Sequence, residues 1–559
     1  MATSTQSTIN NMPMYSPKPF KQICDELNEQ VKLGNDRNGS YHKPSKEQSG
    51  GTANEVAVID ICDDGFNKKK PIEYVTIARR AFKTGRTKNF DFRKKQLKGL
   101  LRFLEIHRSD IEEAVHKDLR KHKQETNMCE IELVANDLRH TLIEFKAWAS
   151  PRKPEKRLIN LLDGVYVQSD PYGVVLIIGA WNYPILLTLG PLVGALAGGN
   201  TVILKPSELA PATNKLLSET LIHYLDTECF QILLGGISET TELLKEKFDY
   251  IFFTGSTKVG QIVHQAAAKN LTPTTLELGG KCPLYLDDTL NVETAARRIV
   301  WGRFLNSGQT CVAPDYIVCS KTVQDKFVEE AKKVLEKFYG SDPMESECLS
   351  KIVSEKHYKR LVGFLRSENI AVGGHCNPQK LLIAPTILIN VGPHDQVMEE
   401  EIFGPILPIL NVLNVREAID FINSREKPLA LYVFSNDKSV QDMFLTETSS
   451  GGVAINDTIS HISTEGLPFG GVGASGMGSY HGKKGFETFT HQKGVLVKDV
   501  GRLTEVAISL RYPPYSDAKT KMINSILKRR RCIPFDVLGK LFLFLLGIAF
   551  AFGVQYLLS

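Results

Sequence analysis

The sequence predicts an α/β protein centred on a parallel, doubly wound sheet. Short, continuously apolar runs such as Val174–Ile178, which lies between Gly173 and Gly179, are typical of strands covered on both faces. Helical segments separate successive runs, and this alternation favours a doubly wound arrangement. The predicted strands are 174–178, 201–204, 230–234, 250–253 and 275–278. The predicted helices between them are 186–197, 212–225, 240–247 and 258–270.

Length and composition limit the possible classes of protein. The chain has 559 residues, 42% of them hydrophobic, which is enough for about two or three domains with large cores. A net charge of +5 is small for this length and does not favour a nucleic-acid partner. The ten cysteines are scattered, without a pair or a Cys/His cluster at metal-ligand spacing. We therefore predict neither a metal site nor a disulfide framework, and a reducing compartment.

Residues 1–71 differ in composition from the rest of the chain. Segments 2–16 and 34–54 are rich in small polar residues and lysine and contain few aliphatic residues. Such segments bury too little apolar surface to become ordered. No apolar signal-peptide core is present, and acidic residues and the late first arginine, Arg37, argue against a mitochondrial presequence. We predict a disordered extension and assign it no role.

Residues 72–150 read as helices. Aliphatic residues recur at helical spacing among Lys and Arg, and a further helix is predicted over 130–148, before Pro151 and Pro154. We interpret the apolar faces of these helices as core. Residues 158–168 then read as an extended arm that leaves the domain.

Polar and glycine residues stand where the predicted strands end. In doubly wound sheets, ligands bind outside the carboxyl ends of the strands. Gly255 precedes a predicted helix start, where backbone amides can approach a phosphate. The candidate binding residues at these ends are Trp181, Asn182, Lys205, Glu208, Gly255, Ser256 and Glu277.

A second glycine motif, Gly471–Gly476, formally satisfies the dinucleotide fingerprint G-x-G-x-x-G. It follows Pro468-Phe469-Gly470 and not a strand, and no helix opens after it. Without that context the dinucleotide interpretation fails, and we predict a flexible loop.

Cys311 lies in an unusual setting for a buried thiol. The segment Asn306–Cys311 is a polar, glycine-bearing turn, and Pro314 follows soon after. Such a loop can hold a sulfur atom at a fixed place, where dipolar surroundings favour the nucleophilic thiolate. A small buried hydrophobe is the usual alternative for a free cysteine. Both interpretations remain open from this stretch alone.

Several separated segments, in this order, resemble the aldehyde dehydrogenase superfamily, and within it the class 3 branch that includes membrane-anchored fatty aldehyde dehydrogenases. The resemblance spans about residues 72–511. The segments that carry it are 179–184, 205–208, 255–260, 277–281, 306–311, 400–405 and 468–471. The N-terminal extension lies outside the resemblance.

The resemblance implies a fold and its domain boundaries. A Rossmann-type NAD-binding domain would comprise 72–150 and 170–278, and an α/β catalytic domain 279–485. A β-arm for oligomerisation would comprise 151–169 and 486–505, which implies a homodimer. Residues 506–540 would form a linker or gate with a basic flank.

The resemblance also implies a role for each site residue. Cys311 would attack an aldehyde carbonyl, the Asn182 amide would stabilise the alkoxide, and Glu277 would activate the water that hydrolyses the thioester. Cofactor-binding residues would be Trp181, Lys205, Glu208, Gly255, Ser256, Glu401 and Phe403. Glu208 beside a ribose 2′-hydroxyl would favour NAD, with NADP possible but weaker.

Each role has a simpler alternative. Asn182 can cap the helix that follows Pro184, Glu277 can be a surface carboxylate, and Lys205 can be a solvated loop residue. The joint occurrence of the motifs in the family's order favours the catalytic roles.

The C-terminus predicts a membrane anchor. Residues 541–559 carry no charged side chain, and as a helix they would be about 28 Å long, near the thickness of a bilayer core. The basic run Lys528–Arg531 precedes them, so the enzyme body should face the cytosol. Endoplasmic reticulum, mitochondrial outer membrane and peroxisome all suit such a tail. A buried core helix or a helix lying on the membrane surface is the alternative.

A membrane anchor on an aldehyde-oxidising enzyme predicts a lipid-derived substrate. The leading hypothesis is NAD-dependent oxidation of long-chain aldehydes to fatty acids. The same chemistry on aromatic or medium-chain aldehydes is the first alternative. A membrane-tethered scaffold without catalysis is another alternative, which the joint presence of Cys311, Glu277, Asn182 and Glu401 disfavours. An acyltransferase that uses the Cys311 thioester with coenzyme A is the last, and Glu277 disfavours it.

Overall fold

The structure is a computed structural model of the whole chain. It describes residues 69–528 except 157–159, 161–162 and 366–368, together with 539–540, 543–544 and 546–547. The chain divides into 1–60 and 61–559, and the first unit lies outside the described residues. The predicted disordered extension, 1–71, therefore falls almost wholly outside them.

The first sheet is the one that the apolar runs predict. Its strand order is β16-β6-β5-β2-β3-β4, and all neighbours are parallel except β16 and β6. The strands are β2 (Val174–Ile178), β3 (Thr201–Lys205), β4 (Phe230–Ile232), β5 (Tyr250–Gly255), β6 (Thr274–Leu278) and β16 (Gly476–Met477). The predicted strands are confirmed, and β2 and β3 are buried along their whole length.

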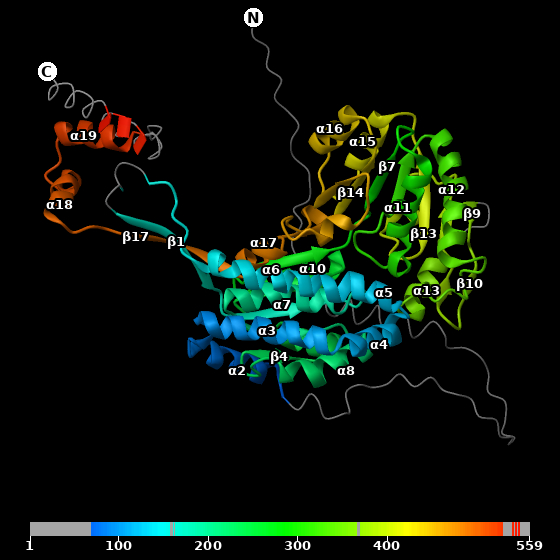
Figure 1. The fold of residues 1–559 in the computed structure, drawn as a ribbon, viewed down its shortest axis with the longest axis horizontal. Coiled ribbons are helices and arrows are strands. Elements are labelled where there is room, and N and C mark those ends of the chain that lie inside the picture. Colours follow the sequence, from blue (N-terminus) through cyan, green and yellow to red (C-terminus); the bar gives the residue numbers. More distant parts are fainter. Residues whose placement is uncertain are drawn as a thin grey trace, which may run out of the picture. The chain divides into compact units, whose positions relative to one another are not determined.

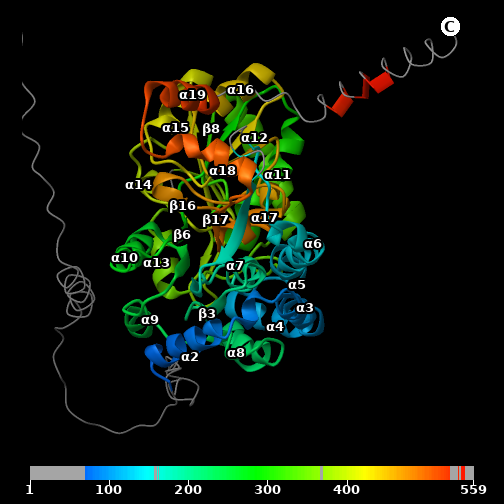
Figure 2. The same ribbon diagram turned by 90° about the vertical axis from the view of Figure 1, so that its left-hand side faces the viewer.

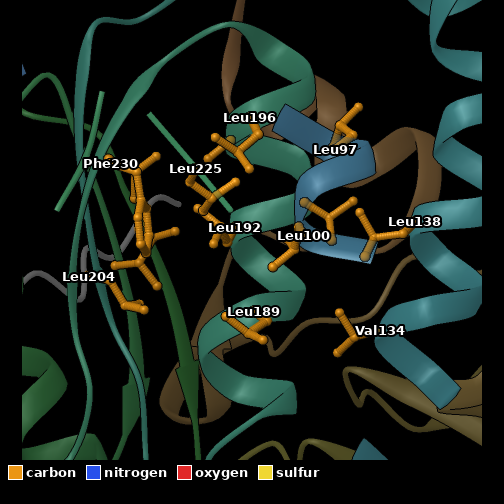
Figure 3. Packing of buried hydrophobic residues seen from close by; sticks show 14 of the residues in the cluster. Leu97, Leu100, Val134, Leu138, Leu189, Leu192, Leu196, Leu204, Leu225 and Phe230 are labelled. Atoms are coloured by element: carbon orange, nitrogen blue, oxygen red, sulfur yellow. The ribbon is translucent and has the colours of Figure 1, made fainter. Parts of the chain in front are cut away.

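Helices flank this sheet and supply its core. They are α2 (Pro71–Lys83), α3 (Phe90–Ile106), α4 (Arg108–Leu119), α5 (Lys123–Thr126), α6 (Glu132–Ala149), α7 (Leu186–Gly198), α8 (Pro211–Thr220), α9 (Ile237–Leu243) and α10 (Thr257–Ala268). Helices α3, α6 and α7 pack together (Figures 1 and 2). Leu192 of α7 lies among Leu100, Leu138 and Phe230 in this core (Figure 3). Helix α7 is buried along almost its whole length and fills the space between α3, α6 and the sheet.

The second sheet belongs to the C-terminal half. Its order is β15-β14-β7-β8-β13-β12-β9. The strands are β7 (Pro283–Leu286), β8 (Tyr316–Cys319), β9 (Ile370–Val372), β12 (Thr386–Leu388), β13 (Ile406–Asn411), β14 (Ala430–Phe434) and β15 (Gly452–Ile455), and a small hairpin is made by β10 (Cys376–Asn377) and β11 (Leu382–Ile383). The helices are α11 (Val292–Phe304), α12 (Lys321–Tyr339), α13 (Glu355–Val362), α14 (Gln396–Glu399), α15 (Val415–Asn423), α16 (Lys438–Glu447) and α17 (Gly482–Thr488).

A two-stranded arm joins distant parts of the chain. Strand β1 (Gly164–Pro171) pairs antiparallel with β17 (Thr490–Val497), which places the predicted arm segments side by side. Two helices follow, α18 (Arg502–Ile508) and α19 (Asp517–Leu527). Within the described residues, no helix combines the length and apolarity needed to cross a membrane. The predicted span, 541–559, lies outside the described residues except 543–544 and 546–547.

Three local predictions are wrong. The motif Gly471–Gly476 is not a loop throughout, because Gly476 begins β16, which pairs with Glu277 on β6. Gly476 has φ of 140°, a conformation that favours glycine, and a strand of two residues shows no alternation to read. Helix α9 begins before residue 240, because the Glu239 side chain accepts from the Gly236 N–H at its N-terminus. The helix predicted from residue 130 begins instead at Glu132, because Glu130 lies in a π-helical turn over Asn127–Ile131.

Candidate active site

A cavity of about 450 Å³ lies where the carboxyl ends of the first sheet's strands meet the second sheet's domain. It brings together most of the predicted site residues. Those that line it are Trp181, Asn182, Gly255, Ser256, Glu277, Cys311, Glu401 and Phe403. Lys205 and Glu208 do not line it and pair with each other, with Lys205 Nζ 3.1 Å from Glu208 Oε2. Lys205 is 3% exposed and Glu208 44%.

The loop that carries Cys311 is held in an uncommon backbone conformation. Asn306 and Ser307 have φ of 52° and 51°, and Gly308 follows with φ of 70°. Non-glycine residues in the left-handed region cost about 1–3 kcal/mol and persist where surrounding contacts hold them. Those contacts are present: Ser307 Oγ donates to the Ser350 carbonyl over 2.6 Å. A Cβ on Gly308 would lie 2.2 Å from the Gly404 carbonyl oxygen. The loop therefore has little freedom to move.

Gln309 fixes the same loop to the neighbouring segment. Its side-chain amide donates to the Lys351 carbonyl over 3.0 Å and accepts from the Val353 N–H over 3.0 Å. Gln309 is fully buried, so these bonds replace all contact with water. The predicted nucleophile thus follows directly after a clamped turn.

The environment of Cys311 raises the pKa of its thiol. Desolvation by burial is the largest cause, and the charges of Glu401 and Glu277 add to it. The backbone N–H groups of Cys311 and Val312 act in the opposite direction. The resting thiol is therefore protonated at neutral pH, and it must lose its proton when it reacts.

Glu277 is a buried carboxyl without a hydrogen-bond partner. It is 3% exposed, and neither side-chain oxygen has a partner in the described structure. Desolvation raises the pKa of Glu277 well above that of a free glutamate. An unpaired buried carboxyl is costly to retain, so its place beside Cys311 in the cavity indicates a chemical role.

Asn182 lies against the loop of Cys311. Its side-chain Nδ2 donates to the Gln309 carbonyl over 3.1 Å, and its own carbonyl accepts from Asn306 Nδ2 over 2.8 Å. Asn182 is 3% exposed. The position places an amide donor next to the thiol, and the helix α7 begins only at Leu186, so Asn182 is not its cap.

One end of the cavity is built by β5, α10 and the loop 400–405. Ser256 caps α10, accepting from the Val259 N–H over 3.4 Å, and Gly255 ends β5. Trp181 meets the ring of Phe403 edge-on, at 5.5 Å between centroids. Burial raises the pKa of Glu401 to about 8. A polar ligand fits this cavity, because the buried Thr254 hydroxyl and the Glu277 carboxyl line it without partners of their own.

Sequence reasoning missed several lining residues. His357 meets Trp181 edge-on at 5.5 Å, and Arg360 donates to the Glu401 carbonyl over 3.3 Å and to Glu400 Oε1 over 3.0 Å. Both belong to α13, a short amphipathic helix without a recognisable motif. The other lining residues to which no role was assigned are Ala180, Leu187, Thr254, Thr257, Lys258, Leu278, Gly279, Glu400, Leu429 and Phe469.

A second, smaller cavity of about 40 Å³ meets the first at Cys311. Both cavities share Leu187, Cys311 and Phe469. The rest of its lining is mostly apolar: Cys129, Tyr183, Leu186, Leu305, Thr310, Val312, Ile459, Ile462, Tyr480 and His481. The thiol therefore lies between a larger cavity of mixed polar and apolar lining and a smaller, almost wholly apolar one.

Comparison with known proteins agrees with this geometry. Residues 65–495 match the model of the aldehyde dehydrogenase family. Aldehyde dehydrogenase family 3 member B1 of Bos taurus is 48% identical over 454 residues, covering 81% of this chain and 97% of the relative. Family 3 member A2 of Rattus norvegicus is 49% identical over 441 residues, covering 79% and 91%. The dimeric NADP-preferring aldehyde dehydrogenase of Canis lupus familiaris is 48% identical over 443 residues, covering 79% and 97%.

Solved structures show the same fold. Substrate-bound AldH of Staphylococcus aureus superposes with a TM-score of 0.80 at 43% identity, covering 82% of this chain and 100% of that one. An aldehyde dehydrogenase of Mycobacterium tuberculosis complexed with NAD⁺ gives 0.69 at 25% identity, covering 77% and 91%. The α/β fold predicted from the sequence is thereby confirmed. The chain belongs to the class 3 branch of the aldehyde dehydrogenase family and is an enzyme that oxidises aldehydes with NAD or NADP.

Proposed function

We propose that the enzyme oxidises long-chain aliphatic aldehydes to fatty acids at a membrane surface. The observation that carries this proposal is the apolar cavity at Cys311, which suits an alkyl chain and offers few polar partners. It shares Leu186, Ile462 and His481 with a further cavity of about 80 Å³. We propose that a longer alkyl chain extends from the first cavity into this one, past the residues that line both.

The reaction begins with attack of the Cys311 sulfur on the aldehyde carbon. The thiol gives its proton to solvent water, a C–S bond forms, and the carbonyl oxygen becomes an alkoxide in a thiohemiacetal. The Asn182 side-chain amide and the Cys311 backbone N–H stabilise that negative charge. When bound, NAD or NADP accepts the hydride that the carbon loses. The product on Cys311 is a thioester.

Water then hydrolyses the thioester. Glu277 takes a proton from the attacking water, the C–S bond breaks, and the carboxylic acid leaves as the Cys311 thiol is restored. Burial raises the pKa of Glu277, which makes it a stronger base than an exposed carboxylate. The cavity residues Trp181, Glu401 and Phe403 would hold the nicotinamide end of the cofactor, and Gly255 and Ser256 its pyrophosphate.

Lys205 and Glu208 would hold the adenine-side ribose, and Glu208 would set the preference for NAD. Its carboxylate lies beside Lys205 and is 44% exposed, free to accept from a 2′-hydroxyl and to repel a 2′-phosphate. We expect Glu208→Gln to lower the ratio of kcat/KM with NAD to kcat/KM with NADP by about 10-fold, since one charge-assisted contact contributes about 1.5 kcal/mol. The ratio of kcat/KM for NAD and NADP measures this. An unchanged ratio contradicts the role, and Glu219→Gln, on the exposed side of α8, serves as the control.

We propose a homodimer that is anchored by residues 541–559 with its body in the cytosol. The support for the dimer is the paired arm of β1 and β17, on which Leu496 and Val497 are exposed, together with the dimeric relative from Canis lupus familiaris. The support for the anchor is the uncharged apolar sequence and its basic flank. Endoplasmic reticulum or mitochondrial outer membrane is the proposed location.

The substrate class is tested by comparing hexadecanal, hexanal and benzaldehyde with the detergent-solubilised full chain. We expect kcat/KM for hexadecanal to exceed that for hexanal by at least about 10-fold, because each buried methylene contributes about 0.8 kcal/mol. NADH formation is the readout. If benzaldehyde were the best substrate, the proposed reaction would stand, but the substrate class would be aromatic and not fatty aldehydes.

A variant of the apolar path separates chain length from chemistry. Ile462 lines both cavities, so Ile462→Trp should lower kcat/KM for hexadecanal and leave kcat/KM for hexanal nearly unchanged. Ile462→Val keeps the path open and is the matched control. Equal loss on both aldehydes would show that the long chain does not take this path.

A further inference from the structure

A fully buried ion pair lies beneath the segment that carries Asn182. Lys121 Nζ and Glu130 Oε1 are 2.6 Å apart, and both side chains are 0% exposed. Burying two charges costs several kcal/mol of desolvation, so a buried pair is weak evidence for a contribution to stability. The burial of these two charges therefore needs a reason other than stability, and the pair's other contacts indicate one.

Those contacts all reach the segment 182–185. Lys121 Nζ donates to the Asn182 carbonyl over 3.0 Å and lies 3.9 Å from the centre of the Tyr183 ring. Glu130 Oε2 accepts from the Ile185 N–H over 2.8 Å. The pair therefore holds the backbone on both sides of Tyr183 with charged hydrogen bonds, which are about twice as strong as neutral ones.

An irregularity in the helix places Glu130 next to the segment 182–185. The π-helical turn Asn127–Ile131 joins α5 to α6, and Glu130 lies within it with no exposed surface. π-Helical turns are rare and occur frequently at functional sites.

The nucleophile's loop is tied to the same buried group. Asn306 Nδ2 donates to the Asn182 carbonyl, which Lys121 also contacts. The Asn306 N–H contacts the carboxyl of Glu125, whose other oxygen is buried without a partner. The positions of the amide of Asn182 and of the sulfur of Cys311 are thus set by one anchor.

We propose that Lys121 and Glu130 are positioning residues for the oxyanion hole: they fix the backbone of Asn182 so that its side-chain amide lies where the alkoxide forms. They touch neither substrate nor cofactor cavity, and act through Asn182. The inference rests on the oxyanion role proposed for Asn182. A misplacement of about 1 Å at such a donor costs about 10²-fold in rate.

The test compares two reactions of the same thiol in the full-length enzyme. Acylation of Cys311 by 4-nitrophenyl acetate forms an oxyanion, whereas alkylation by iodoacetamide forms none. We expect Glu130→Gln to slow acylation about 10- to 100-fold, because the neutral amide weakens the hold on Lys121 and on the Ile185 N–H. Alkylation should change little. A purely structural role would slow both reactions alike or neither.

The matched control is Glu132→Gln, which makes the same chemical change nearby on α6. Glu132 bonds Arg108 and Arg139 at the surface and does not contact the segment 182–185. We expect acylation within about twofold of wild type, since exposed pairs contribute little. A loss equal to that of Glu130→Gln would overturn the proposal.

A second variant covers the case in which Glu130→Gln does not fold. The double change Lys121→Met with Glu130→Leu removes both charges, and such apolar replacements are often neutral for stability. It should fold and still show the selective loss of acylation, and wild-type acylation would overturn the proposal. Asn182→Ala distinguishes the oxyanion role of Asn182 from the positioning role of Lys121 and Glu130. Normal acylation in Asn182→Ala refutes the oxyanion role itself, whereas slow acylation there with normal acylation in the pair's variants refutes only the positioning.

Discussion

Replacing Cys311 by alanine is expected to lower NADH production by about 10⁴-fold or more, since the covalent intermediate cannot form. Cys311 is the thiol at which the two cavities meet, and its loop is held in place by hydrogen bonds of Ser307 and Gln309. Alanine fits the same space, so the fold and the cofactor cavity should be unaffected. Steady-state NADH formation with hexadecanal gives the rate, and NAD binding by fluorescence titration checks that the site remains intact.

The control for thiol removal is Cys348→Ala, because Cys348 is exposed and lines none of the cavities around Cys311. It should turn over as wild type does. Residual turnover within about 10-fold of wild type in Cys311→Ala would mean that another group carries the chemistry. Loss of NAD binding in the same variant would instead indicate a collapsed site.

The first sheet was predictable because burial on both faces leaves a simple pattern. Strands β2 and β3 are continuous apolar runs in a chain that is elsewhere mixed, and glycine flanks the first of them. The order of the strands was not predictable, since no local pattern records which strands lie side by side. Strand β16 shows most clearly that local sequence does not predict strand pairing, because Gly476 joins the edge of the sheet opposite Glu277, which is far away in the sequence.

The predicted site residues came from chemistry and resemblance, and the structure adds what only spatial proximity reveals. The left-handed conformation of Asn306 and Ser307 is held by hydrogen bonds from Ser307 to Ser350 and from Asn306 to Asn182, which no motif encodes. Arg360 reaches the loop 400–405 from a separate helix. The buried pair beneath Asn182 reads in sequence as ordinary charged residues near helix ends, because charge is usually exposed.

Glu277→Gln is expected to stop the enzyme after the first turnover. The amide cannot take a proton from water, so thioester hydrolysis should slow by about 10²- to 10⁴-fold, whereas thioester formation does not need this base. Stopped-flow absorbance should then show a burst of NADH approaching one equivalent per subunit, followed by a slow phase. A burst that slows as much as the steady state would contradict the assignment.

The pH dependence and a chemical rescue test the same assignment independently. Glu277 acts as a base only when ionised, and burial raises its pKa, so wild-type hydrolysis should fall as pH falls through that raised pKa. The residual hydrolysis rate of Glu277→Gln should not show this fall as the pH is lowered. Hydroxylamine cleaves a thioester without a protein base. Added after the burst, once free aldehyde has been removed so that no oxime forms, it should free Glu277→Gln for a second NADH burst with fresh aldehyde, whereas Cys311→Ala should show none. Rescue of neither variant would place the block before the thioester, and Glu277 would then act in forming the intermediate and not in hydrolysing it.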